Sequence, residues 1–145
     1  MGTATLLFIP NIALRESIRN DISAANQALH DGLWKGSTVL AGAAIEALLL
    51  WAIKREPANR IQTARTSVLA SNASTDPDYW GLDQYIRVAK HLGLIEDETQ
   101  QQTILAKDFR NLIHPGRSAR EGQICDRGTA LSALAAVELV VRDLS

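Results

Sequence analysis

The stretch LWKGSTVLAGAAIEALLLWAIKR, residues Leu33 to Arg55, decides the fold of this chain. Its apolar residues follow one another almost without interruption, and it ends in Lys54 and Arg55, cations that suit the C-terminus of a helix. The proline at position 57 disfavours helical backbone before it and stops the helix there. Glycines and alanines give the helix a small-residue face that lets a neighbour approach closely. We therefore predict that this stretch is the central helix of an all-α bundle.

The same stretch is predicted to be buried in protein and not in a membrane. Its apolar part, Val39 to Ile53, contains Glu46 and falls short of the ~20 apolar residues that a membrane span needs. Residues Met1 to Pro10 lack the basic region and the long apolar run of a signal peptide, so we expect an ordered or fraying leader. The single cysteine, Cys125, cannot form an intramolecular disulfide, which favours a cytoplasmic location.

Helical spacing of apolar residues extends outward from the central helix in both directions. Between the central helix and residue 82, a short helix is one interpretation of Ile61 to Leu69, and Ser71 to Asp78 has the composition of a loop. The other predicted helices are Ile12 to Leu29, Leu82 to a stop at Gly93, a helix that follows the acids at 96–98 and ends near His114, and a last helix from about Asp126.

The spacing of apolar residues also predicts which side of each of the last two helices faces the core. The predicted sets are Ile104, Leu105, Phe109, Leu112 and Ile113 for the first of them, and Leu131, Leu134, Ala135, Leu139 and Val140 for the second. With 46% hydrophobic and 21% charged residues, the composition is that of a globular protein. We predict one domain over residues 1–145, a four- to five-helix bundle.

The polar run Arg110-Asn111-Leu112-Ile113-His114-Pro115 is the predicted functional site. Arg110 and His114 are four residues apart, so on a continuous helix they share one face. A permanently charged guanidinium can hold a phosphate, and an imidazole can exchange a proton near neutral pH, which together suit cleavage of an RNA phosphodiester. Asn111 adds an amide. Nearby, Lys107 and Arg117 are predicted to bind phosphate, although the net charge of -1 argues against general coating of nucleic acid.

Structural explanations stand beside each of these assignments. Arg110 would also satisfy Glu46, the one acid inside the central helix, which needs a partner if it is buried. His114 would also suit a helix C-terminus, where the dipole favours a cation, and Asn111 could bond a nearby backbone group. Lys107 could simply lie on a solvated face.

The motif-bearing part of the chain resembles the HEPN family. The resemblance rests on Leu94-Ile95, a polar stretch and then Phe109 to Gly116. It also rests on the long helix with Ala43-Ala44-Ile45-Glu46-Ala47-Leu48-Leu49, followed downstream by Tyr85 to Lys90, and it covers about residues 33 to 117. It implies an all-α, HEPN-like bundle that pairs into a homodimer, with Arg110, Asn111 and His114 as the catalytic site. By the buried-charge argument above, Glu46 would support this site by fixing the arginine.

For function, the resemblance implies a metal-independent endoribonuclease of a toxin-antitoxin or phage-defence type. No cluster of cysteines and histidines has metal-ligand spacing, so we expect no metal and no cofactor. The expected partners are RNA or a nucleotide, and an antitoxin or another protein. Only three residues separate Arg110 from His114, fewer than is usual in the family, which leaves a catalytically inactive binding or interaction module as the alternative.

Overall fold

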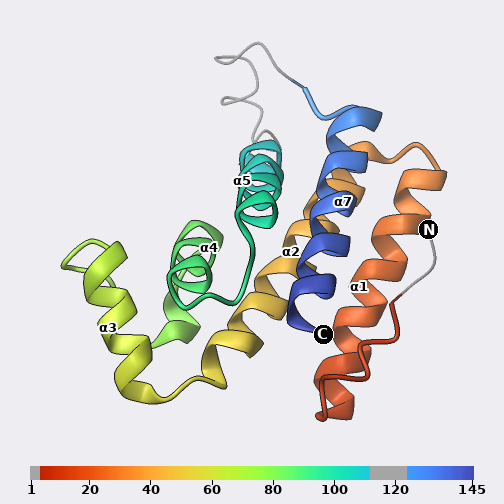
Figure 1. The fold of residues 1–145 in the computed structure, drawn as a ribbon. Helices are drawn as coiled ribbons and strands as arrows, with labels where there is room; N and C mark the ends of the chain where they lie inside the picture. The colour runs from red at the N-terminus through yellow and green to blue at the C-terminus, as the bar shows by residue number, and fades with distance from the viewer. Residues whose placement is uncertain (1–3, 112–123) are drawn as a thin grey trace.

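The computed structural model describes residues 4–111 and 124–145, and these residues form six α-helices, one short 3-10 helix and no strand (Figure 1). The predicted all-α class is confirmed, and the number of helices exceeds the four to five predicted. The elements are α1 (Ile12–His30), α2 (Trp34–Lys54), α3 (Ala58–Val68), the 3-10 helix η1 (Pro77–Tyr79), α4 (Leu82–His91), α5 (Asp97–Asn111) and α7 (Arg127–Leu144).

Helix α2 lies at the centre of the bundle, as its sequence predicts. It packs against α1 and α7 on one side and against α4 and α5 on the other (Figure 1). Its buried residues include Ile45, Leu48 and Leu49, which are fully enclosed. The polar residue Ser37 is buried as well. Its hydroxyl donates a 2.8 Å hydrogen bond to the Ala25 carbonyl of α1, which replaces the hydrogen bond to water that burial removes.

By length and composition α2 could cross a membrane, and it is the one helix of the described residues with that property. More than half of its most apolar window is buried inside the protein. This burial is what the core helix of a soluble protein shows, and it agrees with the sequence-based interpretation.

The described part of the leader, from residue 4 to residue 11, packs against the first turns of α1. Leu6 and Ile9 are almost fully buried. The guanidinium of Arg19 donates to the carbonyl of Ala4 at 3.2 Å, and that of Arg15 donates to the carbonyl of Ile9 at 3.3 Å. Apolar burial and two side-chain bonds to backbone carbonyls therefore hold the leader against α1.

Helix α3 stands at the edge of the molecule, where it mainly contacts α4 (Figure 1). The short helix considered for Ile61 to Leu69 is present and begins three residues earlier, since α3 is helical over 11 residues. After it, Trp80 is buried and donates its indole N–H to the carbonyl of Ser74 at 2.7 Å. That bond ties the predicted loop to the core.

The predicted stop after α4 is confirmed at Gly93, whose φ of +75° favours glycine because a side chain there is strained. The N–H of Leu94 then bonds back to the carbonyl of Ala89 at 2.9 Å. Ile95 follows and is buried. This turn directs the chain into α5, the helix that carries the motif.

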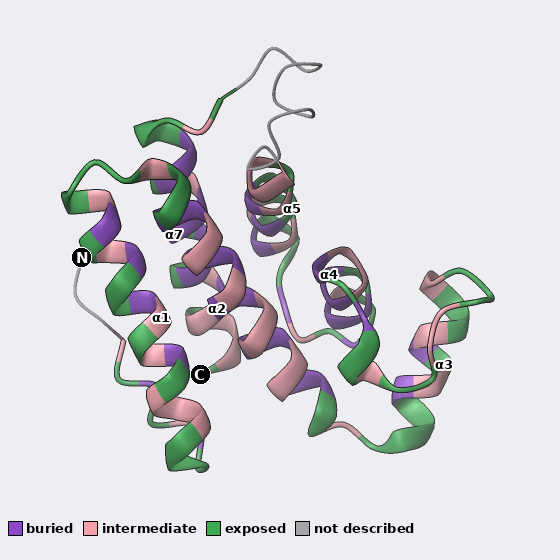
Figure 2. Ribbon diagram, turned by 180° about the vertical axis from the view of Figure 1, so that it is seen from behind, coloured by how far each residue is buried: buried purple, intermediate pink, exposed green. Residues whose placement is uncertain are grey.

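The predicted apolar sides of α5 and α7 need correction. In α5 the buried residues are Thr99, Thr103 and Ala106, while Ile104 and Leu105 are exposed (Figure 2). Small side chains let α5 approach α2 and α7 closely, and the hydroxyl of Thr103 is satisfied by the carbonyl of Thr99 at 2.9 Å. Close packing of small residues therefore prevailed over burial of the larger apolar ones.

The buried side of α7 also differs from the predicted one. Two residues of the predicted apolar side, Leu131 and Ala135, are exposed. The buried set is Thr129, Ala130, Ala133, Leu134, Ala136, Val137 and Val140. The predicted start of this helix is confirmed, since the Asp126 side chain caps it by accepting the N–H of Thr129 at 3.0 Å.

Candidate functional site

The motif enters the described structure at the C-terminal end of α5. The helix begins with Asp97 and Glu98, acids that suit an N-terminus, as predicted. It packs against α2, α4 and α7. Arg110 lies in its last turn and Asn111 is its last described residue; both are partly buried. The packing of α5 therefore fixes the backbone from which the arginine extends.

Arg110 reaches from α5 across to α2. Its guanidinium pairs with the carboxylate of Glu46 at 3.2 Å (Nη1 to Oε2), so the ion pair expected from the sequence forms. The two side chains are 36% and 30% exposed, which means that the pair lies at the surface of the bundle and is not sealed inside it. Solvent and ligands can therefore reach this guanidinium.

Gly42 provides the space that lets Arg110 cross α2. A Cβ at position 42 would lie 2.8 Å from Cδ of Arg110, closer than real Cβ atoms approach other atoms. Gly42 and Glu46 are four residues apart on α2, so they occupy one face of the helix a turn apart. The aliphatic part of the arginine thus lies over the glycine, and its charged end meets the acid.

Tyr85 of α4 lies near the same carboxylate. Burial is the main reason that the pKa of Tyr85 is raised to about 12, and the negative charge of Glu46 contributes next, followed by Asp78 and Asp76. The phenol is anchored, because it donates to the carbonyl of Pro77 at 2.7 Å. At neutral pH this group is an uncharged donor already in use, so it serves packing and not proton transfer.

Lys107, a predicted phosphate ligand, lies one turn before Arg110 on α5. Its ammonium is 3.3 Å from the carboxylate of Asp83 on α4 and 3.4 Å from that of its neighbour Asp108. The side chain is 23% exposed. Two carboxylates therefore offset its charge, and a phosphate would compete with both.

Cys125 sits beside the backbone of the motif. Its thiol lies 3.7 Å from the carbonyl of Phe109, the residue before Arg110. Burial raises the pKa of the Cys125 thiol, Lys35 and Thr129 act in the opposite direction, and Asp126 adds a small further rise. A raised pKa disfavours the thiolate, so the surroundings of this cysteine do not favour a nucleophile.

The other predicted site residues, His114 and Arg117, lie outside the described residues, as does the predicted end of the helix. The structure therefore brings together Arg110, Glu46 and, one turn away, Lys107, while the histidine and the second phosphate ligand stay predictions. Within residues 4–111 and 124–145, no group of three histidine, cysteine or acidic side chains is placed to hold a metal ion.

Sequence reasoning did not predict three neighbours of the motif: Gly42 beneath Arg110, Tyr85 near Glu46, and Asp83 opposite Lys107. The spacing of Gly42 and Glu46 was a usable signal, since a residue with no side chain one turn before an isolated acid leaves room for a long cation to cross. The other two depend on how α4 packs, which has no local signature.

Comparison with protein-family models, with curated proteins and with solved structures finds no match for this chain. The fold and the geometry of the described residues are therefore the observations on which a function can be argued.

Proposed function

We propose that this chain is a HEPN-like endoribonuclease that needs no metal, of the toxin-antitoxin or phage-defence type. The observation that supports the proposal is the accessible guanidinium of Arg110, carried by the last turn of a packed helix and directed across Gly42 to the surface of α2. A positively charged group that is held in place yet reachable is what recognition of a phosphodiester requires.

The ion pair with Glu46 is weak enough to exchange for a phosphate. Ion pairs between exposed side chains contribute about 0–1 kcal/mol, because water competes for both charges. A guanidinium can bind a phosphate through two parallel, charge-assisted hydrogen bonds, which are roughly twice as strong as neutral ones. In the free protein Glu46 thus keeps Arg110 extended, and a phosphate of the substrate replaces it.

The proposed reaction uses the 2′-hydroxyl of RNA as the nucleophile. That oxygen attacks phosphorus, the bond from phosphorus to the 5′-oxygen breaks, and a cyclic phosphate remains on the upstream fragment. The imidazole of His114 takes the proton from the 2′-hydroxyl and then, as imidazolium, supplies it to the leaving 5′-oxygen. Arg110 stabilises the charge that develops on the phosphoryl oxygens, and Asn111 supplies an amide beside it.

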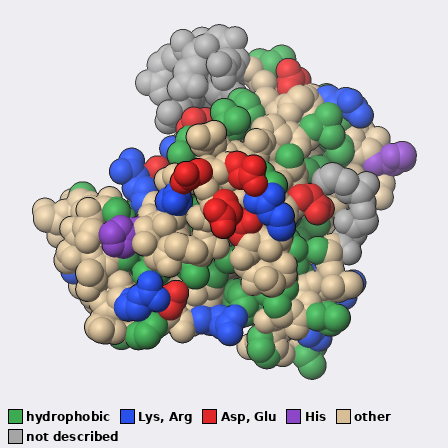
Figure 3. Space-filling model, in the orientation of Figure 1, with side chains coloured by type: hydrophobic (Ala, Val, Ile, Leu, Met, Phe, Trp, Pro, Cys, Tyr) green, Lys and Arg blue, Asp and Glu red, His purple; other side chains and the backbone are tan. Residues whose placement is uncertain are grey.

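A homodimer is part of the proposal, and the α5–α7 surface is where we expect it to form. We define this surface by Ile104, Leu105, Ile124 and Leu131, all of which are exposed. Hydrophobic side chains are visible over these two helices in Figure 3. The bond from Gln102 to Ser132 at 2.7 Å joins the helices beside Leu105 and Leu131. Exposed apolar side chains on two helices that are packed together favour a partner there.

Incubation with RNA in excess chelator tests the proposed activity. We expect fragments that end in a cyclic phosphate, no cleavage of a strand with 2′-deoxyribose at the cut site, and loss of activity in Arg110→Ala and in His114→Ala. Cleavage that persists in both variants would remove the assignment. For the dimer, Leu105→Glu should shift the mass measured by sedimentation to that of a monomer, and Leu7→Glu, at an exposed position in the leader, is the control.

A second candidate is a binding module without turnover. The observation that favours it is the carboxylate of Glu46, which already offsets the guanidinium, together with the short spacing from Arg110 to His114. Such a module would bind RNA, a nucleotide, an antitoxin or another protein through the same arginine. It predicts binding that Arg110→Ala weakens, with no product even after long incubation.

A further inference from the structure

A hollow lies away from the motif, where α1 faces the C-terminal half of α2. It has a volume of about 370 Å³ and is lined by Leu14, Ala47, Leu50, Trp51, Lys54 and Arg55. Ligand sites usually measure about 300–1,000 Å³ and are mostly apolar with a few polar groups. The apolar lining with cations at one end makes this hollow, here called the α1–α2 groove, different from the rest of the surface.

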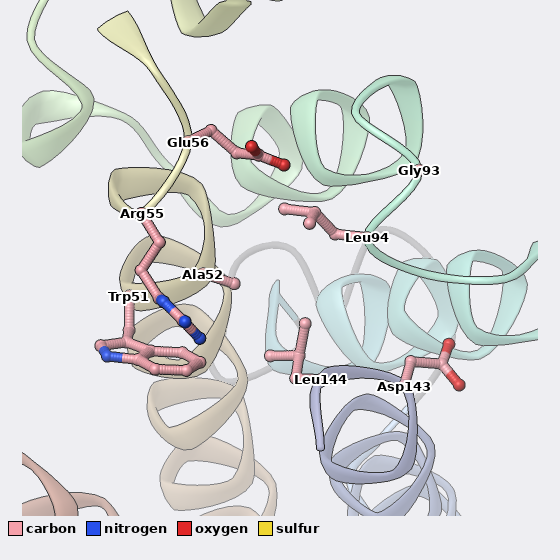
Figure 4. Close-up of a pocket in the computed structure, with 8 residues that line it drawn as sticks. All are labelled: Trp51, Ala52, Arg55, Glu56, Gly93, Leu94, Asp143 and Leu144. Carbon is pink, nitrogen blue, oxygen red and sulfur yellow. The ribbon is translucent and has the colours of Figure 1, made fainter. Parts of the chain in front are cut away.

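Arg55 is the cation that a ligand in the groove would meet. Its guanidinium lies 4.7 Å from the centre of the Trp51 ring, and Figure 4 shows it extended over the indole. Among the described residues Arg55 has no carboxylate partner, whereas Lys54 pairs with Asp78 at 2.9 Å. A cation held against a ring keeps its hydrogen-bond donors available at the edge of the groove.

A second aromatic residue also holds the Trp51 side chain in place. Phe8 of the leader packs against it with ring centres 5.5 Å apart. The indole therefore forms a wall whose position depends on the leader and on α2 together. A ligand entering the groove would contact a wall that is already ordered, which lowers the entropy cost of binding.

The charges around the groove favour an anion. No carboxylate lines it, and Glu16, two residues beyond Leu14 on α1, is paired with Arg19 at 3.0 Å. The neighbouring pocket on the other side of Arg55 differs, because Glu56 and Asp143 line it together with Trp51 and Leu144 (Figure 4). Arg55 lines both pockets, but only in the α1–α2 groove does an anion reach it without a carboxylate in the lining, even though Glu56 and Asp143 are paired with Arg60 and Arg142.

From this combination we propose that the α1–α2 groove binds a small carboxylate with an apolar tail, whose tail lies on Leu14, Leu50 and Trp51 and whose carboxylate meets the Arg55 guanidinium. Apolar burial supplies most of the affinity, and the guanidinium selects the charged head group. The site is separate from the motif, since Arg110 belongs to α5, a helix that contributes no residue to the groove.

Titration of the protein with octanoate, followed by NMR of backbone amides and the Trp51 indole N–H, tests the proposal. We expect saturable shifts at residues 14, 47, 50, 51 and 55, with octanol and acetate each binding at least fivefold more weakly. Arg55→Gln should weaken octanoate about fivefold, the size of an exposed ion pair, and bring it level with octanol. Arg87→Gln, which changes an exposed arginine on α4 outside the groove, should change nothing. Ala47→Leu should fill the groove and abolish the shifts.

Three results would overturn the proposal. Equal affinity for octanol and octanoate would show a groove without selection for charge. Shifts centred on the α5–α7 surface would place the ligand elsewhere. Shifts that depend on protein concentration and not on octanoate would show that a second copy of the chain occupies the groove.

Discussion

Cδ of Arg110 lies so close over Gly42 that a Cβ at that position would be 2.8 Å from it. The absence of a side chain at one residue of α2 therefore decides where the guanidinium of α5 is held. This contact connects a feature of the core helix to the geometry of the proposed site, and it can be changed without altering any charged residue.

Gly42→Ala is expected to displace Arg110 while leaving the fold stable. The arginine side chain can move away from the new methyl group, which separates it from Glu46. Alanine gains up to about 1 kcal/mol of helix propensity over glycine, and the lost ion pair is worth about as much, so the free energy of unfolding should change by less than about 1 kcal/mol. RNA cleavage or binding should fall several-fold.

Gly36→Ala is the matched control for that variant. It lies on the same helix, and a Cβ there would meet its nearest neighbours at an ordinary 4.0 Å. Urea denaturation and an RNA assay on both variants separate stability from function. Full activity in Gly42→Ala would show that the position of Arg110 over Gly42 does not matter for the site.

Glu46→Gln should strengthen the binding of RNA or inorganic phosphate by about two- to fivefold. The reason is that phosphate no longer competes with a carboxylate for the Arg110 guanidinium, and an exposed pair of this kind is worth about 0–1 kcal/mol. Glu138→Gln, on the exposed side of α7, removes the same charge away from the site. Binding measured by fluorescence anisotropy should change only in the first variant; weaker binding in Glu46→Gln would show that the carboxylate positions the guanidinium in the complex.

The phenol of Tyr85 should ionise near pH 12 in the folded protein and near pH 10 in the unfolded chain. Burial favours the neutral form, so folding gains stability from this group that is fully present below pH 10 and is lost as the pH rises towards 12. Absorbance at 295 nm, compared between wild type and Tyr85→Phe, isolates this step. Adding Glu46→Gln should lower the midpoint; an unchanged midpoint would mean that Glu46 does not act on the phenol.

Asp143 should stabilise the fold above pH 4 and lose this contribution in acid. Its burial alone would raise the pKa of the carboxyl, but hydrogen bonds from the Glu96 backbone, Thr99 and Arg142 outweigh this and lower the pKa below 3.8. The stability is therefore present above the unfolded pKa and disappears as the pH falls through the folded one. Unfolding by urea at pH 7 and pH 3 should show a larger difference between wild type and Asp143→Asn at the higher pH. An equal difference at both values would contradict the lowered pKa.

Helix positions were predicted well because their signals are local. The apolar run of α2, the glycine that ends α4 and the aspartate that caps α7 each act within a few residues of the chain. The buried side of α5 was predicted less well. Its larger residues, Ile104 and Leu105, suggested a buried side, but small residues such as Ala106 determine how closely two helices can approach, and that choice depends on the partner helix.

What the sequence by itself determined is the all-α class, the central place of α2 and the need of Glu46 for a cationic partner, because apolar periodicity and an isolated acid in an apolar helix leave few alternatives. The tertiary structure decided that Arg110 meets this acid at the surface, that Gly42 makes room for it and that Ile104 and Leu105 face outward. These relations join residues far apart in the chain, so they follow from the packing of whole helices and have no signature in any single segment.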